Sequence, residues 1–222
     1  MTRNDQDATT RLAAALAASD ASLRLQAALS AGTRPEPGFV PALIARSAEE
    51  PDFFVRDMLT WALTRHSPDL TVPALLAELS STTPQARSQA LHTLSKIGDR
   101  RAWPALTDAL LRDPDDEVAR AAWRTAAGLA PESARAGLAE TLATQLGRGD
   151  RDLQRSLSRA FAELSDVAGP VLRHAAESPD AAVRLHALAT ERIVRDPEEG
   201  FEAALHEARR LNALRSAPTT DG

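Results

Sequence analysis

The side chains with the greatest chemical potential in this sequence are its histidines. They are His66, His92, His174, His186 and His206. No two of them form a His-x-x-x-His pair and none follows a glutamate as Glu-x-x-His, the spacings that put metal ligands on one helix face. The chain has no cysteine, which excludes thiolate ligands, thiol nucleophiles and disulfides. We therefore expect no metal site.

A run of acids at residues 113–117, with the sequence Asp-Pro-Asp-Asp-Glu, could in principle offer oxygen ligands to calcium. It lacks the glycine and the distant bidentate glutamate of an EF-hand loop. Asp-Pro-like segments recur along the chain where helices are expected to begin, so we interpret this run as a helix cap. No nucleophile elbow and no glycine-rich phosphate loop frames the serines and histidines. The sequence therefore predicts a protein without a cofactor and without catalytic residues, that is, not an enzyme.

Two groups of arginines could bind phosphate, nucleic acid or an acidic protein. Arg151, Arg155 and Arg159 stand four residues apart on one predicted helix, and Arg120 and Arg124 stand four apart on an earlier one. Neighbouring acids and a formal net charge of -5 weaken such a patch as a site for a polyanion. Nucleic acid is therefore the less favoured partner.

A repeat with a period of 31 to 32 residues organises these side chains. Its first mark is a Pro-Ala-Leu motif at Pro41, Pro73 and Pro104, with a looser copy at Pro170. These prolines stand 32, 31 and 66 residues apart, and the last interval spans two slightly longer repeats with one proline missing. A missing copy of the motif fits residues 135–138, where the leucine stays in register.

The second mark of the repeat is an arginine that usually follows an apolar residue. The copies are Leu23-Arg24, Val55-Arg56, Ala86-Arg87, Gln154-Arg155 and Val183-Arg184, with the arginine displaced by one in Val118-Ala119-Arg120. The residue three positions after each arginine suits a tight helix contact in all but one copy. These residues are Ala27, Leu59, Ala90 and Ala187, with Ser158 as the polar exception. In the displaced copy Ala122 holds the same register, three positions after Ala119.

Each period therefore predicts two amphipathic helices. The expected pairs begin near residues 20/38, 52/71, 84/101, 115/132, 150/168 and 180/199, after an N-terminal helix near 9–18. An aromatic share of only 4% and a hydrophobic share of 43% fit small-residue helix packing in a folded chain. We expect a disordered N-terminus at 1–8, one solenoid at 9–213 and a disordered tail at 214–222.

These motifs resemble bacterial HEAT-like repeats of the short type related to those in phycobilin-lyase subunits. The resemblance covers about residues 9–213 and implies an all-α, right-handed α–α superhelix with about six helix pairs and an N-terminal half repeat. It also implies that first helices line the outer face and second helices the concave face. Some HEAT-like proteins are DNA glycosylases that use aromatic residues in the concave cleft. The three tryptophans occupy different repeat positions, so we interpret them as core residues.

Charged side chains four and five positions after the second-helix proline should point away from the helix pair. With their nearest charged neighbours they form the predicted partner-binding set: Arg46, Glu78, Asp108, Arg112, Glu140, Arg173 and His174. Their signs are mixed, which suits a protein with its own charge pattern better than a polyanion. The recurring arginines of the first helices are instead expected to pair with acids or carbonyls of the adjoining repeat.

The sequence thus predicts a non-enzymatic scaffold that binds another protein, or an extended segment of one, on its concave surface. The alternatives are a nucleic-acid or phosphate binder that uses the arginine patch, and a lyase-type or glycosylase HEAT-like enzyme or enzyme subunit. A polar N-terminus without a signal peptide, no long apolar run and no cysteine predict a cytoplasmic protein with no membrane contact. Lys96 is the only lysine, which suggests a bacterium with a GC-rich genome. The sequence predicts no oligomeric state.

Overall fold

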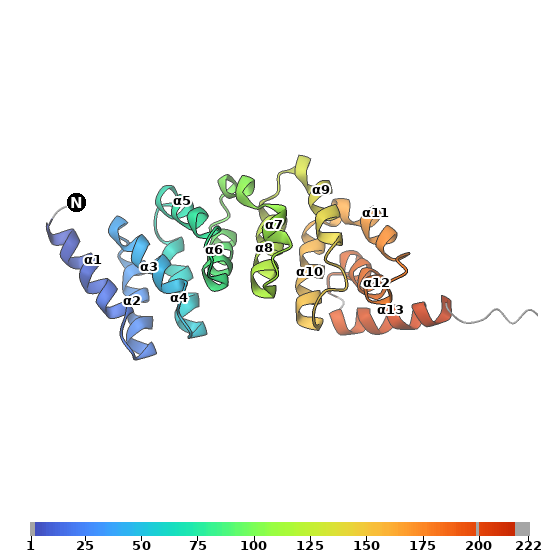
Figure 1. Cartoon of the computed structure of the whole chain (residues 1–222), viewed down its shortest axis with the longest axis horizontal. Coiled ribbons are helices and arrows are strands. Elements are labelled where there is room, and N and C mark those ends of the chain that lie inside the picture. Colours follow the sequence, from blue (N-terminus) through green and yellow to red (C-terminus); the bar gives the residue numbers. More distant parts are fainter. Residues whose placement is uncertain (1–2, 199, 216–222) are drawn as a thin grey trace, which may run out of the picture. The chain divides into compact units, whose positions relative to one another are not determined.

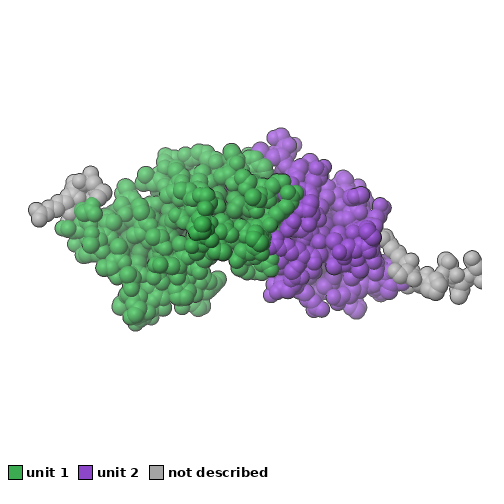
Figure 2. Space-filling view, in the orientation of Figure 1, with its two compact units in different colours: residues 1–125 green, residues 126–222 purple. Residues whose placement is uncertain are grey.

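The computed structural model describes residues 3–198 and 200–215 and contains helices but no strand within them. The chain divides into two compact units, Met1–Thr125 and Ala126–Gly222 (Figure 2). The helices of unit 1 are α1 (Arg3–Leu16), α2 (Ala21–Thr33), η1 (Pro37–Phe39), α3 (Val40–Ser47), α4 (Phe53–Thr64), α5 (Pro68–Glu78), α6 (Pro84–Ile97), η2 (Arg100–Ala105) and α7 (Asp108–Leu111). Helix α8 (Asp116–Leu129) crosses the boundary, and unit 2 continues with α9 (Glu132–Ala143), α10 (Arg151–Glu163), α11 (Ser165–Ala175), α12 (Ala181–Arg195) and α13 (Phe201–Arg215).

The helices alternate between two rows within each unit (Figure 1). In unit 1, α2 contacts α4 and α4 contacts α6, while α1 contacts α3 and α3 contacts α5. In unit 2, α10 contacts α12 and α9 contacts α11. In these pairs a first helix thus packs on the first helix of the next repeat, as stacked repeats require. The chain is an all-α repeat solenoid, which confirms the predicted fold class.

The residue at the tight-contact position of each repeat copy lies in the core, and this includes the polar exception Ser158. Leu59, Ala122, Ser158 and Ala187 are fully buried, and Ala27 and Ala90 are nearly so. The tryptophans serve packing as well. Trp123 is fully buried and its indole N–H donates to the Leu111 carbonyl at 2.8 Å. The Trp61 ring lies so close to Gly32 of α2 that a Cβ there would come within 2.3 Å of it.

Helix starts follow the caps that the sequence indicated. Asp52, Asp150 and Asp180 each accept backbone N–H groups from the first turn of α4, α10 and α12. In the 113–117 run, Asp115 accepts the N–H groups of Glu117 and Val118, so the interpretation of this run as a cap is confirmed.

The predicted boundaries fail at two places. Helix α1 begins at Arg3, so residues 3–8 are helical rather than disordered, while residues 1–2 and the tail at 216–222 lie outside the described residues. The second helix of the third pair is broken into η2 and the single turn α7. Pro104 has no N–H to continue an α-helical ladder, and the backbone is extended at Thr107 before the helix restarts.

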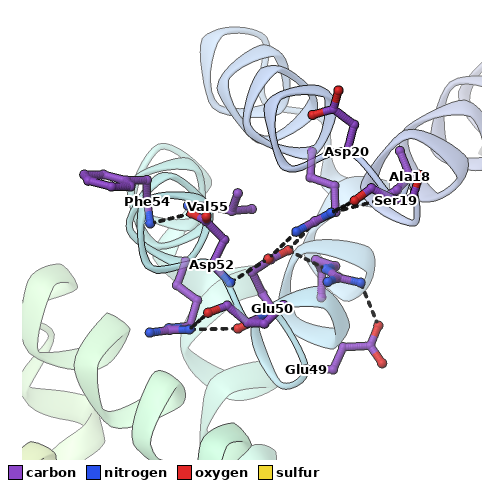
Figure 3. A network of polar contacts seen from close by, with 12 residues as sticks. Ala18, Ser19, Asp20, Glu49, Glu50, Asp52, Phe54 and Val55 are labelled. Carbon is purple, nitrogen blue, oxygen red and sulfur yellow. Dashed lines mark hydrogen bonds and ion pairs between the residues drawn. The ribbon is translucent and has the colours of Figure 1, made fainter.

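The buried carboxylate of Glu50 ties α2, α3 and the start of α4 together (Figure 3). Arg24 donates to it through Nε and Nη2, both at 2.7 Å, and Arg46 donates through Nε at 2.7 Å. The Asp52 N–H adds a bond at 2.9 Å. Burial alone would raise the pKa of Glu50, but these hydrogen bonds outweigh it and lower the pKa to about 2.

Glu50→Gln should lower the free energy of unfolding by about 3 kcal/mol, because a neutral amide leaves the Arg24 guanidinium buried without its counter-charge. Chemical denaturation of both proteins measures this difference. Glu49→Gln is the matched control, since the Glu49 side chain is 71% exposed and its pair with Arg46 is 3.4 Å long. The control should change stability by less than about 0.5 kcal/mol. Equal losses in the two variants would contradict the role given to Glu50.

Acid should remove the same stabilisation. The pKa of Glu50 lies below its ordinary value of 4.5, so the unfolded chain binds a proton more readily than the folded protein. The contribution is therefore complete above about pH 4.5 and is lost as the pH falls toward 2, and it amounts to about 3 kcal/mol. Denaturation curves at several pH values should show the wild type and Glu50→Gln converging in acid. A constant difference between them would contradict this account.

Candidate functional site

A groove of about 350 Å³ crosses the first helices α4, α6 and α8 within unit 1. Helix α4 lines the groove with Phe53 and with side chains one and two turns further along. Helix α6 contributes side chains from its central turns, and α8 contributes side chains from its first half. The lining residues are Phe53, Arg56, Asp57, Thr60, Ser88, Gln89, His92, Glu117, Arg120, Ala121 and Arg124. Small side chains such as Ser88 and Ala121 line it as well, which leaves room between the helices.

This groove lies on the first helices, whereas the sequence analysis placed the binding surface on the second helices. All its lining residues belong to first helices, so it is a candidate surface that the sequence analysis did not identify. The expectation that second helices line the concave face stays a prediction. The apolar pattern of a helix shows which side faces the core. It does not show in which direction successive pairs curve.

Cations slightly outnumber anions in the groove. Arg56, Arg120 and Arg124 face Asp57 and Glu117. Arg120 pairs loosely with Glu117, at 3.4 Å through Nη2, and its buried Nε has no hydrogen-bond partner among the described residues. An N–H group in this state is a donor that a ligand could satisfy.

His92 adds an uncharged imidazole to this charged surface. Its partial burial lowers the pKa to about 4, and the positive charges of Arg124 and Lys96 act in the same direction. Asp57 opposes them. His92 is therefore neutral at physiological pH and can both donate and accept a hydrogen bond.

Two exposed phenylalanines flank the groove at the start of α4. Phe53 is 66% exposed and Phe54 is 72% exposed, and their rings meet edge to face with centroids 5.7 Å apart. The Arg56 guanidinium lies 6.0 Å from the centre of the Phe53 ring. Sequence reasoning missed this pair. Other copies of the repeat have small or polar residues at the same two places, such as Ala21-Ser22 and Pro84-Gln85, and that departure was the available signal.

A second hollow, of about 590 Å³, lies within unit 2 between α9, α11 and the start of α12. It brings together Glu140 and His174, two members of the predicted partner-binding set. Thr144, Glu177 and Ser178 also line it. The hollow is thus mildly acidic, in contrast to the groove of unit 1. Arg173 is exposed beside it in sequence but is not part of its lining.

The remaining members of the predicted set lie in unit 1 and have structural contacts. Arg46 is held by Glu50 at 2.7 Å and by Glu49 at 3.4 Å. Arg112 pairs with Asp108 at 3.1 Å on the surface. Glu78 lines only a void of about 10 Å³ between α3, α5 and α6.

His186 is a core residue of unit 2 rather than a ligand. Its Nδ1 accepts the N–H of Gly147 at 3.0 Å, and its Nε2 donates to the Gln154 carbonyl at 3.0 Å and lies 3.2 Å from Ser158 Oγ. Burial lowers its pKa to about 4, although the bond to Gln154 acts in the opposite direction. Among the described residues, no group of three potential ligands is arranged to hold a metal ion.

Three arginines of the proposed basic patch pair with acids, one of them being Arg120 with Glu117. Arg151 pairs with Glu202 at 3.0 Å and Arg155 with Asp152 at 3.0 Å. They belong to unit 2, whereas Arg120 and Arg124 belong to unit 1. A continuous patch across α8 and α10 therefore stays a prediction.

The family model of HEAT repeats matches residues 55–127 and 72–147. This part of the chain consists of HEAT repeats, which confirms the family resemblance. The match includes α4, α6 and α8, so the groove lies entirely on or beside repeat helices. No curated protein matches the sequence. Within the described residues, no helix has the length and apolar character that a membrane span needs.

Two solved structures are similar to this chain over most of their length. One is human deoxyhypusine hydroxylase in complex with glycerol, with 16% identity over 94% of this chain and 97% of that one, and a TM-score of 0.46. The other is the complex of CpcE and CpcF of phycocyanin lyase from Nostoc sp. PCC7120, with 21% identity, coverages of 91% and 94%, and a TM-score of 0.37. Similarity at this level assigns no substrate or partner.

These structures nevertheless correct one prediction. The chain was expected not to be an enzyme because it lacks a familiar catalytic motif. The two similar structures are an enzyme and a complex from a lyase, which overturns that conclusion. The lack of a familiar motif in a repeat chain of this kind is therefore no reason to deny it an enzymatic role.

Arg124→Gln should raise the pKa of His92 above 4 while leaving it below 6.5, because one repelling charge is removed but the imidazole remains partly buried. Titration of the histidine ring signals by NMR measures this change. Arg65→Gln, at the end of α4, removes a charge that does not act on His92 and should leave its titration unchanged. An unaltered His92 titration in Arg124→Gln would contradict the electrostatics described for the groove.

Proposed function

We propose that this chain binds a segment of another protein in the groove formed by α4, α6 and α8. The observation that carries the proposal is the combination, in one groove, of arginines from two helices with the exposed Phe53, whose ring contacts the exposed ring of Phe54. Arginine and aromatic side chains dominate the binding energy of protein interfaces, and they do so next to partly enclosed hollows.

The shape and the charge of the groove support a protein segment over a polyanion. The groove runs across three neighbouring helices, so an extended segment could contact all of them. Asp57 and Glu117 lie among its arginines, and the chain carries a formal net charge of -5. Both features oppose a uniformly negative ligand. The proposal includes a bacterial, cytoplasmic setting, supported by the single lysine and the lack of cysteine.

A second proposed surface is the unit 2 hollow, which contains Glu140 and His174. Glu140 and His174 are the two members of the predicted second-helix set that line a hollow. Its carboxylates would suit a basic side chain of a partner. Asp108, Arg112 and Arg173 remain proposed as rim residues. Arg46 is a weaker member because Glu50 holds its guanidinium, and Glu78 is a weaker member because it lines only a small void.

Selection of a random dodecapeptide library on the purified protein tests the groove. Recovered peptides should bind the wild type, and the double variant Arg120→Glu/Arg124→Glu should weaken that binding by at least about thirtyfold, since an interface arginine commonly contributes 2 kcal/mol or more. Fluorescence polarisation with the synthesised peptides measures the change. Circular dichroism and the melting temperature of the variant establish that it is folded.

Arg173→Glu/His174→Glu is the control, because it also introduces two neighbouring glutamates, but at exposed positions of unit 2. Peptides that lose affinity only in the control would place binding on the second-helix surface and contradict the groove. Recovery of no peptide, together with binding of a single-stranded oligonucleotide that falls steeply with salt, would favour the arginine-patch alternative instead.

A further inference from the structure

Four of the repeat arginines, Arg24, Arg56, Arg87 and Arg184, share one anchoring contact. In each of these four, Nη1 donates to one or two backbone carbonyls of the loop that precedes its own helix. Arg24 donates to Ala18 and Ser19 at 2.9 and 2.8 Å, and Arg56 donates to Glu50 and Pro51 at 2.9 and 2.8 Å. Arg87 and Arg184 make the equivalent bonds to the Ser81 and Ser178 carbonyls. One edge of the guanidinium is thus fixed by the fold.

The other edge, formed by Nε and Nη2, usually meets an acceptor from the next repeat. Arg24 binds the Glu50 carboxylate at 2.7 Å through both atoms, and Arg87 binds the Asp113 carboxylate at 3.1 Å through both atoms. In unit 2, Arg184 Nε binds the side-chain oxygen of Asn212 at 2.7 Å. This planar edge is shaped for two-point binding of a carboxylate.

Arg56 lacks this second partner. The residue that corresponds to Glu50 and Asp113 is Ser81, as the turn geometry shows. Ser81 Oγ accepts the N–H two residues later, as the Glu50 and Asp113 carboxylates do. A serine hydroxyl offers no carboxylate, and residues 81–83 contain no acid. Neither Nε nor Nη2 of Arg56 has a hydrogen-bond or ion-pair partner among the described residues.

Arg56 is also the repeat arginine that lines the groove. It lies half-buried beside the exposed Phe53 ring, with Arg120 and Arg124 on the same groove surface. Because the two loop carbonyls already orient the guanidinium, a carboxylate that binds the open edge costs little side-chain entropy. The other repeats display the geometry that such a ligand would adopt.

We propose that the open Nε–Nη2 edge of Arg56 receives an aspartate or glutamate side chain of the partner, so that the groove selects an acidic segment. The inference rests on the proposed function and specifies the chemistry of its ligand. The incoming carboxylate takes the place that Glu50 occupies on Arg24 and Asp113 occupies on Arg87. An aromatic or aliphatic residue next to the acid would contact Phe53.

Ser81→Glu provides the sharpest test, because it supplies the missing internal carboxylate and leaves every groove residue in place. With peptides selected on the wild type as the probe, this variant should weaken binding at least tenfold and raise the melting temperature by about 2–4 °C. Ser80→Glu is the matched control, since it adds the same charge one residue earlier at an exposed position. It should bind like the wild type. Equal effects of the two variants would overturn the inference.

Variants of Arg56 and of the peptide complete the test. Arg56→Lys keeps the charge but cannot form the two-point contact, so it should also weaken binding at least tenfold. Replacement of the acids of a selected peptide by their amides should have the same effect on the wild type and none on Ser81→Glu. The inference is wrong if selected peptides require Arg120 and Arg124 but carry no acid, or if inorganic phosphate displaces them at lower concentration than glutarate does. In either case the proposed function itself still stands.

Discussion

A buried guanidinium keeps its charge at every accessible pH, so each of its N–H groups needs an acceptor. This requirement organises the repeat. Arg24 illustrates it: one edge binds the carbonyls of the loop before α2, and the other binds Glu50 at the turn into α4. A single side chain thus satisfies carbonyls that no helix ladder uses and joins two successive repeats. The same bonds keep Glu50 ionised. Replacement of either partner would therefore leave the charge of the other buried without its counter-charge.

The same requirement applies to a repeat arginine that has no acidic partner in the next repeat. Where a repeat supplies the arginine but no acid, the open edge must be satisfied by solvent or by a ligand. Arg56 is in this position, and it lies in the groove of unit 1 rather than inside the core. Two other features of the groove agree with a ligand site. Arg120 has a buried N–H without a partner, and Phe53 leaves most of an aromatic ring in solvent. Each of these features is unfavourable for the isolated chain, and all of them become favourable against a partner of suitable chemistry.

Sequence reasoning predicted the helix pairs and the core because both depend on local periodicity. Leu59 and Ala187 could be assigned to the core from their distance to a repeat arginine, and both are fully buried. The broken second helix of the third pair could not be predicted, since the motif around Pro104 matches the intact copy around Pro73. The groove on the first helices was not predicted, for a related reason. Its position depends on side-chain volumes summed over three neighbouring helices, and no single repeat contains that information.

Comparison of the repeats with one another identifies part of the groove that sequence reasoning missed. Each repeat solves the same packing problem, so a residue type shared by the copies reports the architecture, and a departure needs a separate explanation. Phe53 stands where other copies have small or polar residues, and Ser81 stands where two copies have an acid. The first departure exposes apolar surface and the second forgoes an internal ion pair, so neither stabilises the isolated chain. Phe53 lies in the first turn of α4, and Ser81 lies in the turn before α6, at the position whose equivalents bind Arg24 and Arg87. Phe53 lines the groove, and Ser81 leaves the groove residue Arg56 without an internal carboxylate. A shared ligand explains both departures together better than two unrelated packing effects do.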